Sequence, residues 1–147
     1  MKIAIVSGFF NPLHGGHLDM IEAARKLGDK LIVIVNNDVQ QVIKKDKIIL
    51  PEQNRMRLMA ALRDVDEVVL AIDQDPPVTK TLEKIAKQYP NDEIIFANGG
   101  DRVDPNALPG LEAAMCEQLG IAMVFGVGGD QKADSSTRIN QALGHKK

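Results

Sequence analysis

The chain has 147 residues, a formal net charge of −2 and only 3% aromatic residues. Because there is no basic excess and stacking side chains are scarce, this composition argues against nucleic acid as a partner. No apolar run approaches membrane-spanning length and no cleavage signal is visible, so we expect one domain over residues 1–147, cytoplasmic and without a membrane partner. Cys116 is the only cysteine, and its apolar helical surroundings predict a buried packing role.

Apolar runs and helical patterns alternate along the chain. Short β-branched runs predict strands at residues 3–6, 31–35, 68–72, 94–97 and 122–125. Helical spacing predicts helices at residues 18–27, 52–63, 79–89 and 111–119, with a short one after residue 135. This alternation predicts an α/β fold with a doubly wound, parallel, five-stranded sheet and helices on both faces, and such sheets bind ligands beyond the carboxyl ends of their strands.

The first predicted turn runs from Gly8 to His17, directly after a strand and at the start of a helix. A helix N-terminus favours an anion, because its first N–H groups lack partners within the helix and it carries a partial positive charge. His14 and His17 are three residues apart, so both imidazoles can project toward the same side. We therefore expect a phosphate cradle, although two surface histidines or half of a zinc site would give the same spacing.

The turn fills every fixed position of Gly-x-Phe-Asp/Asn-x-x-His-x-Gly-His, and it resembles the signature of the cytidylyltransferase-like nucleotidyltransferases. The resemblance implies a Rossmann-like domain that transfers a nucleotidyl group to a phosphorylated small molecule and releases pyrophosphate. It also implies catalytic roles for His14 and His17. The nucleotide-binding residues that it implies in this turn are Gly8, Phe9, Phe10, Asn11 and Gly16.

Charged residues after the second strand extend the resemblance to glycerol-phosphate cytidylyltransferases and to the nucleotidyltransferase domain of the ADP-heptose pathway. In the family a mobile lysine here reaches the nucleotide phosphates, and either Lys44 or Lys45 matches it, with Lys44 preferred as the catalytic residue. Arg55 matches a phosphate-gripping arginine and Asp38 a polar position, so both are expected to bind the acceptor. Alternatively, Asp38 only pins its loop by an Asx-type hydrogen bond. Arg57 is expected to be an exposed helix residue.

Two further segments follow predicted strands. Asn98, Gly100 and Asp101 lie after the fourth strand, where relatives of the resembled family carry a similar glycine-rich segment next to the nucleotide, although a plain turn could use the same residues. Ser135, Ser136 and Thr137 match a nucleotide-binding segment, and Arg138 a catalytic basic residue, although serine and threonine are also ordinary helix N-caps.

The resemblance therefore implies transfer of CMP or AMP from CTP or ATP to an alcohol or sugar phosphate. Flavin phosphates are also used on this scaffold. Mg²⁺ would be bound through the nucleotide phosphates, and a homodimer is expected because small relatives are often dimers. The segment from Gly128 to Lys132 departs from the glycerol-phosphate enzymes, which leaves the nucleotide and the acceptor open. The alternative is a nucleotide-binding regulatory protein without turnover on the same fold.

Overall fold

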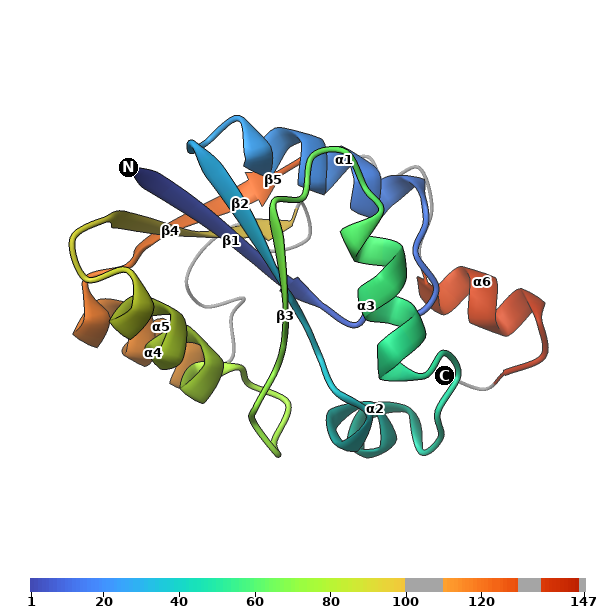
Figure 1. The fold of residues 1–147 in the computed structure, drawn as a ribbon. Helices are drawn as coiled ribbons and strands as arrows, with labels where there is room; N and C mark the ends of the chain where they lie inside the picture. Colours follow the sequence, from blue (N-terminus) through green and yellow to red (C-terminus); the bar gives the residue numbers. More distant parts are fainter. Residues whose placement is uncertain (100–109, 130–135, 146–147) are drawn as a thin grey trace.

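The computed structural model describes residues 1–99, 110–129 and 136–145. Its centre is a sheet of five parallel strands in the order β3-β2-β1-β4-β5 (Figure 1). The strands are β1 (Lys2–Gly8), β2 (Lys30–Val35), β3 (Glu67–Leu70), β4 (Glu93–Gly99) and β5 (Ala122–Val127). The order reverses beside β1, which pairs with β2 on one side and with β4 on the other. The carboxyl ends of β1 and β4 therefore form the switch point at which such sheets bind ligands.

Helices pack on both faces of the sheet (Figure 1). Helices α1 (Gly15–Arg25) and α3 (Glu52–Ala60) cover one face, and α4 (Thr79–Gln88) and α5 (Gly110–Leu119) cover the other. Helices α2 (Asp38–Lys45) and α6 (Ser136–Ala142) lie outside these two layers. None of the helices in the described part of the chain is both long and apolar enough to cross a membrane. The alternation of parallel strands with covering helices confirms the predicted doubly wound α/β fold.

Each strand of the sheet centre sends alternate side chains to opposite faces, as an extended backbone requires. In β1, Ile3 and Ile5 pack with residues of α4 and α5, whereas Ala4 and Val6 pack with residues of α1 and α3. All four side chains are fully buried. Two apolar layers thus fix β1 from both sides and hold the turn that follows it.

Helix α2 was not predicted, because its buried face is polar. Gln40 and Gln41 are fully buried, while Val39 and Ile43 are 57% and 51% exposed. The helix begins with a reciprocal cap in which Asn37 Oδ1 accepts from Gln40 N–H and Gln40 Oε1 accepts from Asn37 N–H. Hydrogen bonds rather than apolar burial therefore hold this helix in place. A sequence pattern that looks for a buried apolar face does not predict such a helix.

Cys116 packs in the layer between α4, α5 and the sheet, as the sequence predicts. Its burial, with a smaller contribution from the nearby Glu112 carboxylate, raises the pKa of the thiol to about 11. At pH 8 only about 10⁻³ of such a thiol is ionised, so iodoacetamide should label the folded protein far more slowly than the urea-unfolded protein. Labelling at the same rate in both states would contradict this burial.

The same pKa sets a pH dependence of stability. Between about pH 9 and pH 11 the unfolded chain has lost the thiol proton while the folded chain retains it, so the unfolded state binds fewer protons. The free energy of unfolding should therefore fall as the pH rises through this window. Urea unfolding of the wild type and of Cys116→Ala, compared from pH 8 to pH 11, checks the effect. The drop should be smaller in the variant, and equal drops would contradict it.

Candidate active site

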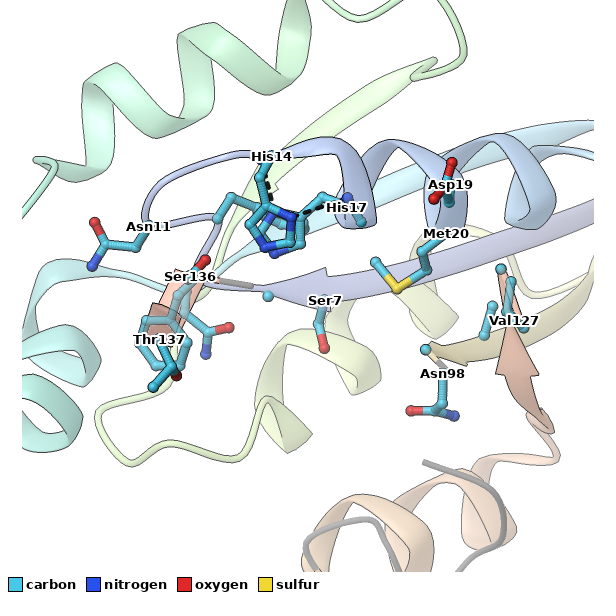
Figure 2. Close-up of a pocket in the computed structure, with 18 of the residues that line it drawn as sticks. Ser7, Asn11, His14, His17, Asp19, Met20, Asn98, Val127, Ser136 and Thr137 are labelled. Carbon is cyan, nitrogen blue, oxygen red and sulfur yellow. Dashed lines mark hydrogen bonds between the residues drawn. The ribbon is translucent and has the colours of Figure 1, made fainter. Parts of the chain in front are cut away.

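A pocket of about 500 Å³ opens at the carboxyl ends of β1, β4 and β5. Ser7 and Gly8 at the end of β1, Asn98 at the end of β4 and Val127 at the end of β5 all line it. Much of the remaining lining comes from the turn after β1, from α1 and from the ends of α2 and α6 (Figure 2). The pocket thus lies where the strand order predicts a ligand site.

The two histidines of the turn stand side by side in the pocket wall. Their rings are stacked, with centroids 3.8 Å apart and an interplanar angle of 27° (Figure 2). The edge of the buried Phe10 ring packs against His17, with centroids 4.9 Å apart. Phe10 therefore supports the imidazole, and a Cβ at Gly8 would lie only 3.0 Å from its ring, so a larger residue at Gly8 would require this ring to shift.

The backbone determines which nitrogen of each imidazole carries the proton. His14 Nδ1 accepts a hydrogen bond from Gly16 N–H at 3.0 Å, and His17 Nδ1 accepts one from His14 N–H at 3.3 Å. A nitrogen that accepts a hydrogen bond has no hydrogen, so the proton of the neutral ring is on Nε2 in both residues. The turn therefore presents two Nε2–H donors, while the amides of His14 and Gly16 are already used to orient the rings.

Arg55 is placed differently from the expected acceptor-binding role. It is 0% exposed, does not line the pocket, and its guanidinium donates to the carbonyl oxygens of Leu50, Phe9 and Asn36. It also forms an ion pair of 2.9 Å with Asp38 Oδ1. Asp38, which is also outside the pocket lining, joins α2 to α3 through this pair. These contacts of Arg55 hold together the turn after β1, the end of β2 and the start of α2, which suits a role in positioning the pocket walls.

Asn11 belongs to the same buried network. Its Nδ2 donates to Gln41 Oε1 at 2.6 Å, its Oδ1 accepts from Leu50 N–H at 3.0 Å, and its backbone oxygen accepts from Asn140 Nδ2. Figure 2 shows its amide pointing away from the two imidazoles. The side chain expected to bind nucleotide thus ties the turn to α2, and its backbone ties it to α6.

Both candidate lysines line the pocket from the last turn of α2. Lys44 is exposed, and its Nζ lies 4.8 Å from the centre of the Phe9 ring, which also lines the pocket. Lys45 is half-buried in the same wall. The unpredicted helix α2 therefore carries this pair of positive charges to the mouth of the pocket.

The remaining predicted residues divide into three groups. Ser136 and Thr137 line the pocket, and Ser136 Oγ donates to Pro12 O at 2.9 Å. Arg138 is exposed on α6 and is not in the pocket lining. Gly100, Asp101 and Ser135 lie outside the described residues.

Several lining residues were not predicted. Ser7, Asn36 and Val127 end or directly follow strands, so the rule that ligands bind at carboxyl ends could have found them. Asp19, Met20 and Glu112 come from the helices α1 and α5, and they line the pocket only because of how these helices pack. No local sequence signal marks those three residues.

The donor set suits a magnesium ion carried by a nucleotide. Among residues 1–99, 110–129 and 136–145, no three His, Cys, Asp or Glu side chains come together as a metal site. Asp19 and Glu112 are the carboxylates among the described lining residues. Because Mg²⁺ commonly takes one or two carboxylates and completes its shell with phosphate oxygens and water, this sparse set fits the ion.

Gly128 brings the end of β5 against α1 at the edge of the pocket. It has φ +90°, and a Cβ there would lie 2.9 Å from the Met20 backbone, whereas Gly129 has φ +88° and open space around a Cβ. Both alanine variants suffer the backbone strain of a positive φ, which costs about 1–3 kcal/mol, but only Gly128→Ala adds a clash. Urea unfolding should show the larger loss for Gly128→Ala, and equal losses would contradict the contact.

Comparisons with known proteins agree with this geometry. The family described as cytidylyltransferase-like matches residues 5–147. A FAD synthase from Methanosphaerula palustris is 34% identical over 97% of this chain and 88% of its own length. The bifunctional protein HldE from Methylococcus capsulatus is also 34% identical over 97% of this chain. The lipopolysaccharide core biosynthesis protein from Thermoplasma volcanium superimposes with a TM-score of 0.69 and 27% identity, covering 91% of this chain and 99% of that one.

The coverage of some relatives is partial. This chain spans 28% of the length of that HldE protein. It spans 54% of the length of a FAD synthase from Ferroglobus placidus, which is 42% identical over 58% of this chain. The family match nevertheless covers residues 5–147, and the FAD synthase from Methanosphaerula palustris aligns along most of its own length. These two findings confirm the resemblance seen in the histidine turn: the chain belongs to the cytidylyltransferase-like family.

Proposed function

We propose that this chain is a nucleotidyltransferase that transfers AMP or CMP from ATP or CTP to a phosphorylated small molecule and releases pyrophosphate. The observation that carries the proposal is the pair of stacked imidazoles, each with its proton on Nε2, in the wall of a pocket at the switch point of the sheet. Two oriented N–H donors suit the negative charge that grows on a phosphate during transfer.

In the proposed reaction, an oxygen of the acceptor phosphate attacks the α-phosphorus of the nucleotide. A bond forms between that oxygen and the phosphorus, the bond from the phosphorus to the β-phosphate oxygen breaks, and pyrophosphate leaves. A phosphate monoester is already largely dianionic at pH 7, with a second pKa of about 6, so the attacking oxygen needs no general base. The protein then has to position the two substrates and stabilise charge.

The residues divide this work by their place in the pocket. His14 and His17 donate to the α-phosphate and to the leaving pyrophosphate. Lys44, with its ammonium beside Phe9 in the pocket wall, supplies positive charge to the β- and γ-phosphates, and Arg138, which is exposed on α6 next to the lining residues Ser136 and Thr137, adds to it from outside the lining. Lys45 faces the acceptor phosphate, in the role that the resemblance implied for Arg55. Mg²⁺, when bound through the nucleotide phosphates, adds positive charge to the same oxygens.

The proposed acceptor class is supported by the relatives more than by the pocket. FAD synthases join an adenylyl group to a flavin phosphate, and the aligned FAD synthase matches this chain over most of both lengths. Sugar phosphates are the second proposed class of acceptor, because the chain is also similar to HldE. We include in the proposal a single catalytic domain over residues 1–147, a homodimer and a cytoplasmic location.

A pyrophosphate-release assay tests the proposal. Mg²⁺ with ATP or CTP is combined in turn with FMN, a sugar phosphate or glycerol 3-phosphate, and pyrophosphate is measured with and without each acceptor. Release that requires one nucleotide and one acceptor supports transfer. Nucleotide binding without release in any combination would instead favour a regulatory nucleotide-binding protein.

A further inference from the structure

The amide of Asn98, at the end of β4, is oriented by two backbone carbonyls. Its Nδ2 donates to Phe96 O at 3.2 Å and to Val124 O at 3.3 Å, and the residue is 3% exposed. Because both neighbours are acceptors, the NH₂ group must face them, which settles the orientation of the amide. Among the described residues nothing donates to its Oδ1, and Asn98 lines the pocket.

Asn98 lies in a part of the pocket that suits a nucleobase. Figure 2 shows it near Val127 and Met20, on the side of the imidazoles opposite Asn11, Ser136 and Thr137. Met20 and Val127 give this part apolar walls, with Asp19 beside Met20, and the two imidazoles lie to one side of it (Figure 2). If the phosphates of a nucleotide contact the histidines, its flat and largely apolar base can occupy the part of the pocket beside Asn98.

We propose that Asn98 is a specificity residue whose Oδ1 accepts a hydrogen bond from the exocyclic amino group of the base. This inference rests on the proposed function. Adenine and cytosine carry an amino group, whereas hypoxanthine and uracil carry a carbonyl oxygen at the equivalent position. A carbonyl there would face the acceptor Oδ1, and Asn98 cannot turn its NH₂ group inward without leaving both backbone carbonyls unpaired.

Two pairs of nucleotides test the inference on the wild-type protein. ATP and ITP differ in the exocyclic group of a purine and in the proton on the neighbouring ring nitrogen, and CTP and UTP differ in the same two ways in a pyrimidine. Calorimetric dissociation constants are measured for all four with Mg²⁺. In whichever pair binds, the amino nucleotide should bind at least about tenfold more tightly, because a buried site that loses its hydrogen bond rejects the analogue.

Asn98→Leu removes the acceptor at similar size, and the ratio within each pair should then fall to about one. Asn91→Leu is the matched control, since Asn91 is exposed and does not line the pocket, and it should keep the wild-type ratio. If Asn98→Leu does not fold, the wild-type ratios decide alone. Equal affinities within the pairs, or an unchanged ratio in folded Asn98→Leu, would overturn this inference but not the proposed function. Failure of all four nucleotides to bind would overturn both.

Discussion

Replacing His17 by glutamine should lower kcat about 10²–10³-fold, the loss typical of removing one donor to a charge that develops in the transition state. Glutamine suits this position because it is the third residue of the helix, where a glutamine side chain can accept from the N-cap amide as His17 Nδ1 does. The variant therefore keeps the helix cap, but its neutral amide NH₂ is placed differently from the imidazole Nε2–H and cannot take up a proton. Its free energy of unfolding should stay close to that of the wild type.

His14→Asn tests the second donor by the same logic. Asparagine is a strong N-cap, so its oxygen can accept from Gly16 N–H as His14 Nδ1 does, but its amide NH₂ lies closer to the backbone and does not reach as far as the imidazole Nε2–H. His145→Gln is the matched control, since His145 lies outside the pocket and contacts Lys47. Turnover is measured by pyrophosphate release and stability by urea unfolding. Wild-type kcat in both His14→Asn and His17→Gln would remove the imidazoles from the mechanism.

Replacing Arg55 by methionine should lower the free energy of unfolding by about 3–5 kcal/mol, the usual cost of removing one partner from a buried ion pair. Arg55 is fully buried and Asp38 is 23% exposed, so the loss leaves a largely buried carboxylate without its cation and takes the guanidinium donor from three carbonyl oxygens, of which Leu50 O keeps Gln41 Nε2 as a donor. Lysine should not restore the stability, because one ammonium cannot reproduce the fork of the guanidinium.

Arg57→Met is the control for this change, since Arg57 is exposed two residues further along the same helix, and it should alter the free energy of unfolding by less than about 0.5 kcal/mol. Urea unfolding of the wild type and of the three variants gives the comparison. A stable Arg55→Met protein with a raised KM for the acceptor phosphate would contradict the positioning role. It would support the acceptor-binding role that the family resemblance implies.

The parts of the site that could be predicted are those encoded by neighbouring residues. Strand β1, the histidine turn and the start of α1 all lie within residues 2–25. One continuous sequence pattern there predicts both the local fold and the chemistry of the two histidines. The five strands were predicted for the same reason, because each is a short apolar run. Local pattern and tertiary structure agree in these segments.

The parts that could not be predicted depend on which face of an element is buried. Arg55 and Arg57 are the same residue type two positions apart in one helix, so the sequence does not distinguish them. Packing alone buries Arg55 and exposes Arg57. Helix α2 buries glutamines and exposes valines, which inverts the usual pattern. The orientation of Asn98 depends on Val124 O, which belongs to a different strand and is 26 residues away in the chain. These features depend on tertiary contacts between distant residues, and a short stretch of sequence does not contain such contacts.

The central claim is that this pocket binds a nucleoside triphosphate through the histidine turn, and a thermal-unfolding comparison tests it most directly. The wild type, His17→Gln and His145→Gln are heated with and without Mg²⁺ plus ATP or CTP. At a nucleotide concentration about 100 times Kd, binding should add about 2.7 kcal/mol to the stability of the wild type and of His145→Gln, and clearly less to that of His17→Gln. Equal stabilisation of all three proteins, or none in any of them, would contradict the account.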